Sequence, residues 1–145
     1  MATPAENEAT VRELIERVMN QGDIAFADKV ISDAYIERNP MPGGSADKAG
    51  AIAMFEMMRD QTPDMRIEVE DVIASGNKVA VRSTMHGTDT KGFMPGTPAT
   101  NKSFSMGAID VFTFDEDGMN TEHYGVYDIA GTMMQLGLAE PPPQG

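Results

Sequence analysis

The second half of the chain alternates apolar and polar residues with a period of two, the period of a half-buried β-strand. In its first strand, Met65, Ile67 and Val69 alternate with charged residues. The turn sequences Ser75-Gly76-Asn77 and Asp115–Gly118 separate such runs and are typical of hairpins. This part of the chain therefore predicts an antiparallel meander. Its last two strands are expected over 102–114 and 119–128, after a long Gly-, Pro- and Thr-rich loop over 87–101.

The first 61 residues follow a helical period instead. Apolar residues form one stripe along a predicted helix over 7–20: Val11, Leu14, Ile15, Val18 and Met19. Gly22 suits a left-handed helix end, and Asp23 is suited to cap a second helix over 24–32. An extended segment over 34–39 follows, and Ser45 is the expected N-cap of a third helix over 46–61. A short helix over 129–136 closes the chain.

Helices that precede an antiparallel meander predict an α+β fold. Helices on one face of a curved sheet form a cone that can enclose a pocket. The length of 145 residues suits a single domain over 1–145. We expect its core to span about 7–138 and residues 139–145 to form a loose tail.

Composition narrows the classes of partner. The net charge of −12 disfavours nucleic acids and anionic membranes. The absence of cysteine excludes disulfides and thiol chemistry, and two histidines alone give little support for a metal site. The N-terminus lacks the pattern of a signal peptide, so a cytoplasmic protein is expected. The 13 methionines fill either the core or an adaptable apolar pocket.

Two aspartates are candidate catalytic residues. Asp128 lies at the end of the last strand and shares the strand parity of Tyr124 and Val126. It is either a general base facing an apolar pocket or the N-cap of the closing helix. Asp110 alternates with Ala108 and Phe112, so it faces either the pocket or a polar outer surface. Two carboxylates in one pocket would give an acid and a base.

Other polar residues are candidates for donors and ligand contacts. Tyr124 is a candidate donor to an enolate oxygen, and His86 lies next to the long loop, near the expected pocket mouth. His123 has the opposite parity from Asp128 and is expected to face outward if Asp128 faces inward. The expected substrate-binding residues are Tyr35, Arg38, Phe55, Met58, Met106 and Phe112. Arg38 either binds a carboxylate of the substrate or pairs with a nearby glutamate.

Several segments together resemble the SnoaL-like polyketide cyclase family, which belongs to the nuclear-transport-factor-2-like superfamily. They are NQGD (20–23), AYIERNP (34–40), TPDMRIEVEDVIASGNKVAVR (62–82), IDVFTFDEDG (109–118), EHYGVYD (122–128) and QLG (135–137). The chain departs from the family's pattern at Arg38, Asp89 and Tyr124, where the family often has His, His and Trp.

The resemblance implies a cofactor-independent enzyme that closes a polyketide ring by intramolecular aldol condensation, with the base at Asp128. The expected substrate is a bulky, largely apolar carbonyl compound. A related isomerase is included in this interpretation. The alternatives are a non-catalytic ligand-binding or dimerisation module of the same fold and, with less support, an epoxide or ester hydrolase. A pocket without an inward carboxylate would favour the binding module.

Apolar residues are expected on both faces of the sheet, although helices cover only one. The residues in question are Val69, Val72, Ile73, Val79 and Val81. We therefore expect a homodimer that buries the second face, as the resemblance also implies.

Overall fold

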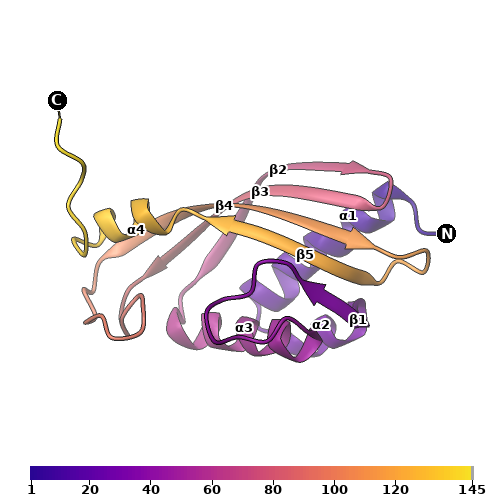
Figure 1. Cartoon of the computed structure of the whole chain (residues 1–145), viewed down its shortest axis with the longest axis horizontal. Helices are drawn as coiled ribbons and strands as arrows, with labels where there is room; N and C mark the ends of the chain where they lie inside the picture. Colours follow the sequence, from indigo (N-terminus) through magenta and orange to yellow (C-terminus); the bar gives the residue numbers. More distant parts are fainter. Residues whose placement is uncertain (145) are drawn as a thin grey trace.

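The computed structural model describes residues 1–144 and has one curved, five-stranded sheet with helices across one of its faces (Figure 1). The strand order is β1-β5-β4-β3-β2. The predicted α+β fold is confirmed. In chain order the elements are α1 (Pro4–Glu13), η1 (Leu14–Asn20), α2 (Ile24–Val30), β1 (Ile31–Glu37), α3 (Lys48–Gln61), β2 (Arg66–Ser75), β3 (Lys78–Thr88), β4 (Ser103–Phe114), β5 (Asn120–Tyr127) and α4 (Ile129–Gln135).

The four C-terminal strands form the predicted antiparallel meander. Both hairpin turns join adjacent antiparallel strands, β2 to β3 and β4 to β5. Gly76 and Gly118 take positive φ angles of 56° and 79°, which glycine adopts without steric cost. The segment predicted only as extended forms β1, which pairs in parallel with β5. That pairing joins the first third of the chain to the last strand.

The predicted helix over 7–20 begins earlier and changes type. Thr3 and Glu6 form a reciprocal capping box, so α1 begins at Pro4. From Leu14 the helix continues as a π-helix, η1. Asn20 fixes its end, because the Asn20 amide accepts from the Ile67 N–H at 2.7 Å and donates to the Ile67 carbonyl at 3.1 Å.

The predicted cap of α3 is wrong by two residues. Asp47 caps this helix by accepting from the Gly50 N–H at 2.9 Å. Ser45 lies outside the helix and donates its hydroxyl to the Asp47 carboxylate at 2.7 Å. Asp is as good an N-cap as Ser, so the sequence offered two equivalent start points.

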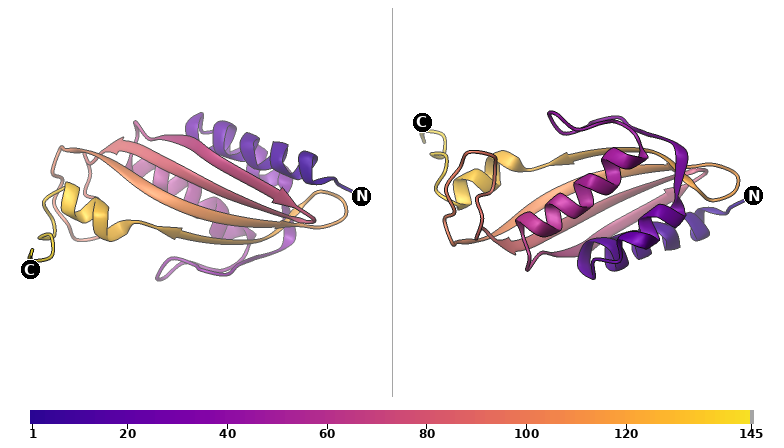
Figure 2. Two further views of the ribbon diagram at one scale, coloured as in Figure 1. Left: turned by 90° about the horizontal axis from the view of Figure 1, so that it is seen from above. Right: turned by 90° about the horizontal axis from the view of Figure 1, so that it is seen from below.

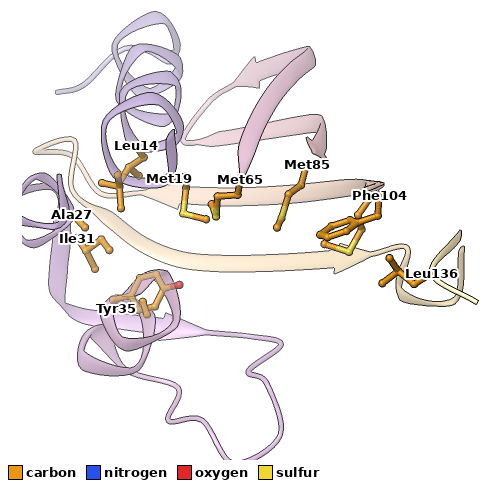
Figure 3. Packing of buried hydrophobic residues seen from close by; sticks show 12 residues of the cluster. Leu14, Met19, Ala27, Ile31, Tyr35, Met65, Met85, Phe104 and Leu136 are labelled. Atoms are coloured by element: carbon orange, nitrogen blue, oxygen red, sulfur yellow. The ribbon is translucent and has the colours of Figure 1, made fainter. Parts of the chain in front are cut away.

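The core lies between the sheet and the helices, as Figure 3 shows for Leu14, Met19, Tyr35 and Met85. The predicted stripe of the first helix faces this layer. A second cluster, formed by Val11, Val79, Val81 and Phe114, lies beneath α1. No helix in residues 1–144 combines the length and apolarity that crossing a membrane requires.

In the part of the chain that the structure describes, the opposite face of the sheet carries no helix (Figure 2). Its exposed apolar side chains are Ile73, Ile109, Tyr124 and Val126. Of the five residues expected to spread over both faces, Ile73 alone lies here. A register shift between Val69 and Asp71 turns both Val69 and Val72 toward the helices, and Val79 and Val81 are buried there too. We propose that a second copy of the chain covers this patch.

Replacing Ile109 by lysine tests the dimer. A charge at the centre of an apolar interface is expected to raise the dimer dissociation constant by about tenfold or more. Sedimentation at tens of micromolar should show a wild-type dimer and a dissociated variant. Met57→Lys is the matched control, because Met57 is similarly exposed but lies on α3. A monomeric wild type would contradict the proposal.

Candidate active site

A cavity of about 80 Å³ lies between the inner face of the sheet and the helices η1 and α3. Its lining is largely apolar and includes five methionines: Met19, Met54, Met58, Met85 and Met106. Six of the predicted site residues lie at its wall: Tyr35, Phe55, Met58, Met106, Asp110 and Phe112. Unbranched methionine side chains adapt their shape readily, so this wall suits an apolar ligand.

A chain of hydrogen bonds supplies most of the polar residues of the cavity wall, namely Tyr35, Asp110, His123 and Tyr127. At its centre, the imidazole of His123 lies between two carboxylates. Nε2 of His123 is 2.7 Å from Oδ1 of Asp110, and Nδ1 is 2.6 Å from Oε2 of Glu37. A tyrosine hydroxyl donates to each carboxylate: Tyr127 to Asp110 Oδ1 at 3.2 Å and Tyr35 to Glu37 Oε2 at 2.8 Å.

Strand register brings these five residues together. Glu37 on β1 is the direct partner of His123 on β5, and Asp110 on β4 is opposite Gly125. Because side chains alternate along β5, His123 and Tyr127 lie on the same face, on either side of Gly125. A Cβ at position 125 would come within 2.5 Å of Asp110 Oδ1 and 2.6 Å of the Tyr127 hydroxyl. The missing side chain leaves the space that the cluster occupies.

Gly125→Ala is therefore expected to disrupt the cluster. The added methyl group must displace the Asp110 carboxylate or the Tyr127 hydroxyl, at a cost of about 1–3 kcal/mol in the free energy of unfolding. Gly107→Ala is the matched control, because a Cβ at this β4 position meets no atom within 4 Å. Urea denaturation of both variants measures the difference. Equal stability of the two would contradict the steric role of Gly125.

Electrostatics favour a positively charged His123. Burial alone would lower the pKa of this imidazole, but its hydrogen bonds to Asp110 and Glu37, together with their charges, raise it to about 9. Burial opposes ionisation of Glu37, but the hydrogen bond and charge of His123 prevail and lower its pKa. Burial, followed by the adjacent carboxylates, raises the pKa of Tyr35 and Tyr127, so both phenols stay protonated.

Asp110 keeps one oxygen free for chemistry. Its side chain is 17% exposed and lines the cavity. Both of its hydrogen bonds use Oδ1, and within residues 1–144 none uses Oδ2. A carboxylate with a free oxygen in an apolar cavity is suited to remove a proton from a bound ligand.

The predicted orientation of Asp128 and Tyr124 is wrong. β5 ends at Tyr127, and Asp128 caps α4 by accepting from the Gly131 N–H at 2.9 Å. Asp128 is exposed and lies outside the cavity, and Tyr124 is 48% exposed on the outer face. The parity argument was sound, but its reference residue was not: Tyr124 and Val126 face outward, and His123 faces inward.

His86 and Arg38 also lie away from the cavity. His86 is on the outer face of β3, where Nδ1 is 2.9 Å from the Ser105 hydroxyl. Arg38 forms a two-pronged ion pair with Glu122, at 3.1 and 3.2 Å, in an exposed position. His86 was placed by its proximity to a loop, which does not determine which way a side chain points, whereas the pairing of Arg38 with a glutamate is the second of the two roles that its sequence left open.

Sequence reasoning missed Glu37 and Tyr127 and assigned His123 to the wrong face. One signal was available for β5. If Asp110 faces inward, the side chains of β5 that face the same way form one of two alternating sets. The set that contains His123 and excludes Tyr124 places a polar partner beside the carboxylate. Nothing in the sequence pattern indicates that Glu37 pairs with His123, 86 residues away.

Comparisons with known proteins point to one family. The model of the SnoaL-like polyketide cyclase family matches residues 9–136. A curated relative, "Probable cyclase otaY" from Aspergillus carbonarius (strain ITEM 5010), is 33% identical over 91 residues. The match covers 63% of this chain and 63% of the relative's own length.

Two solved structures have the same fold. TsrD from Streptomyces laurentii superposes with a TM-score of 0.84 at 24% identity, covering 96% of this chain and all of TsrD. Wild-type IdmH from Streptomyces antibioticus, a candidate polyketide cyclase, superposes with a TM-score of 0.80 at 26% identity. That match covers 91% of this chain and 99% of IdmH.

Proposed function

The chain belongs to the SnoaL-like polyketide cyclase family, and from that premise we propose that it is a cofactor-independent enzyme that removes a proton next to a carbonyl group. Asp110 is the general base in this proposal. The outcome is an intramolecular aldol ring closure or a related isomerisation of a bulky, largely apolar carbonyl compound.

One observation carries the proposal: the free Oδ2 of Asp110 at the wall of an apolar cavity. A non-catalytic binding module would have no use for an ionisable carboxylate there, because burying a charge costs several kcal/mol unless it is paired. Here His123 supplies the pairing and leaves one oxygen accessible. This arrangement favours an enzyme over a binding or dimerisation module.

The proposed reaction begins with transfer of a proton from the carbon next to the substrate carbonyl to Oδ2 of Asp110. The C–H electron pair moves into the enolate. The enolate carbon then attacks a second carbonyl of the same molecule and forms the new C–C bond. The resulting alkoxide takes the proton back from Asp110, so the enzyme is restored and no other reactant is required.

Two neighbours stabilise the enolate in this scheme. The imidazolium of His123 compensates negative charge in the low-dielectric cavity. The Tyr127 hydroxyl bonds Asp110 Oδ1 at a long 3.2 Å. When Asp110 becomes protonated its oxygen attracts this hydrogen less strongly, which frees the phenol to donate to the enolate oxygen. Tyr127 thus takes the role that the sequence assigned to Tyr124.

Hydrogen–deuterium exchange tests the proton transfer without knowledge of the natural substrate. A bulky apolar ketone such as 2-tetralone is incubated with the protein in D₂O, and loss of its α-proton signals is followed by NMR. We expect exchange above the buffer rate that is saturable in ketone. No exchange above the buffer rate with 2-tetralone or a set of cyclic 1,3-diketones would contradict the proposal.

The pH profile reports on His123. The imidazolium is present below its pKa of about 9 and is lost above it. Above that pH the enolate would form beside two carboxylates with no positive charge between them, so kcat/KM is expected to fall about tenfold per pH unit. The measurement is the enzymatic exchange rate between pH 7 and 10.5, corrected for the buffer rate. A rate that keeps rising through pH 10 would contradict this assignment.

A further inference from the structure

We propose that Glu37 is a positioning residue for this reaction: from the far side of His123, it holds the ring as an imidazolium whose Nε2–H is directed at Asp110. The inference rests on the proposed function of Asp110. It concerns a carboxylate that touches neither the expected substrate position nor the base itself, and that contributes to catalysis through another side chain.

Geometry supports this role. Glu37 and His123 are register partners on adjacent parallel strands, so the backbone fixes their separation. Oε2 of Glu37 is 2.6 Å from Nδ1 of His123 and also accepts the Tyr35 hydroxyl at 2.8 Å. Oε1 accepts the Asn39 N–H at 3.0 Å. These three bonds fix both oxygens of a side chain that is only 8% exposed.

The orientation of the ring follows from these contacts. With Nδ1 held by Glu37, Nε2 lies 2.7 Å from Oδ1 of Asp110. Both ring nitrogens then act as donors, which requires the doubly protonated ring. The bond from Nε2 occupies Oδ1 of Asp110 and leaves Oδ2 for the substrate. Glu37 therefore determines both the charge beside the base and the oxygen with which the base reacts.

Within residues 1–144, few charged or titratable groups face this imidazole. Those that do are Tyr35 and Glu37 from β1, Asp110 from β4 and Tyr127 from β5. The helices η1 and α3 contribute apolar residues to the cavity, among them Leu14, Met19, Phe55 and Met58. The phenols stay protonated, so the two carboxylates alone hold the positive charge of the ring. Removing one of them should be visible in the titration of His123.

NMR measures this titration directly. The chain has two histidines, so the Cε1–H region of the spectrum contains two resonances, which a His86→Gln variant assigns. In the wild type we expect His123 to titrate near pH 9. In Glu37→Gln the midpoint should fall by at least one pH unit. Glu122→Gln is the matched control, because it removes the same charge from an exposed residue paired with Arg38 and should leave the midpoint unchanged.

Activity separates a positioning role from a merely structural one. In Glu37→Gln, the alkaline fall of ketone exchange should move down with the His123 midpoint. At pH 6, where the ring remains protonated, the loss of kcat should be smaller than at pH 9, because only the hold on the ring's orientation is missing there. A structural defect would instead lower the rate equally at every pH. A midpoint that moves while the alkaline fall stays in place would overturn the proposal.

A second variant tests the effect of Glu37 on the titration of His123 without altering Glu37 itself. In Asp110→Asn, Glu37 is the remaining charged partner, so His123 should still titrate above its ordinary value of 6.5 despite burial. A midpoint at or below 6.5, or an unchanged midpoint in folded Glu37→Gln, would overturn the assignment. These NMR results stand even if the wild type exchanges no ketone, an outcome that would contradict the proposed function instead.

Discussion

Replacing Asp110 by asparagine is expected to lower turnover by about 10²–10⁴-fold while the protein remains folded. Asparagine keeps the size of the side chain. Its carbonyl oxygen still accepts hydrogen bonds from His123 and Tyr127, which use Oδ1 alone in the wild type. The lost property is the basicity of the second oxygen, which becomes an amide nitrogen. The loss should appear in kcat, because the shape and apolar lining of the cavity do not change.

Asp128→Asn is the matched control for this experiment. The substitution is the same, but Asp128 caps α4 on the exposed side of the chain. Asparagine caps helices as well as aspartate does, so both activity and melting temperature should stay close to wild type. Ketone exchange rates and thermal melts of the two variants measure the difference. Equal turnover of Asp110→Asn and the wild type would contradict the assignment of Asp110 as the base.

Replacing His123 by alanine is expected to lower the free energy of unfolding by about 3–5 kcal/mol. His123 is almost fully buried, and its removal leaves Glu37 and Asp110 facing each other without the positive charge that pairs them. Removing one partner of a buried ion pair costs far more than the pair contributes, because the remaining charge is desolvated. The lost ring also leaves a void against Phe112, whose ring centroid is 4.9 Å away.

The second histidine provides the control. His86 lies on the outer face and is 35% exposed, so His86→Ala should cost about 0.5 kcal/mol or less. Urea denaturation at pH 7 and pH 5 distinguishes charge from volume. The penalty of His123→Ala should shrink at pH 5 as the unpaired carboxylates take up protons, whereas a void costs the same at both values. A penalty equal to that of His86→Ala would contradict the buried ion cluster.

The wild type should show the corresponding pH dependence. The pKa of His123 is about 9 in the folded chain and 6.5 in its ordinary state. The stabilisation that its charge provides is therefore complete below pH 6.5 and is lost as the pH rises to about 9. The lowered pKa of Glu37 has the opposite effect on the pH dependence. Its contribution to stability is present above the pKa of an ordinary glutamate and is lost as the pH falls below that pKa.

Strand positions were predictable because period-two alternation and Gly-containing turns are local signals. Which face of a strand points inward is a different question, and an error of one residue reverses every side chain. Asp110 was assigned from its own neighbours, Ala108 and Phe112, and lies at the cavity. Asp128 was assigned from its place at a strand end, where the chain already leaves the sheet. Its carboxylate caps the N-terminus of α4 instead, as the alternative N-cap interpretation predicted.

Local sequence patterns could not predict the contribution of β1 to the site. Its segment reads as extended, but its parallel pairing with β5 depends on the whole chain between them. Tyr35 was expected at the pocket for its type, whereas Glu37 was overlooked because a lone glutamate in a short extended segment is usually exposed. Only the register of Glu37 with His123 gives its carboxylate a charged partner.

β1 is an edge strand held to the sheet on one side only, by β5 (Figure 1). Edge elements open locally with a lower free energy than central strands, without global unfolding. Each opening of β1 would remove Glu37 and Tyr35 together from the site and leave the β2–β5 meander folded. The amides of β1 should therefore exchange faster than those of β4, and on warming the proposed ketone exchange should be lost at a temperature where most of the sheet is still intact.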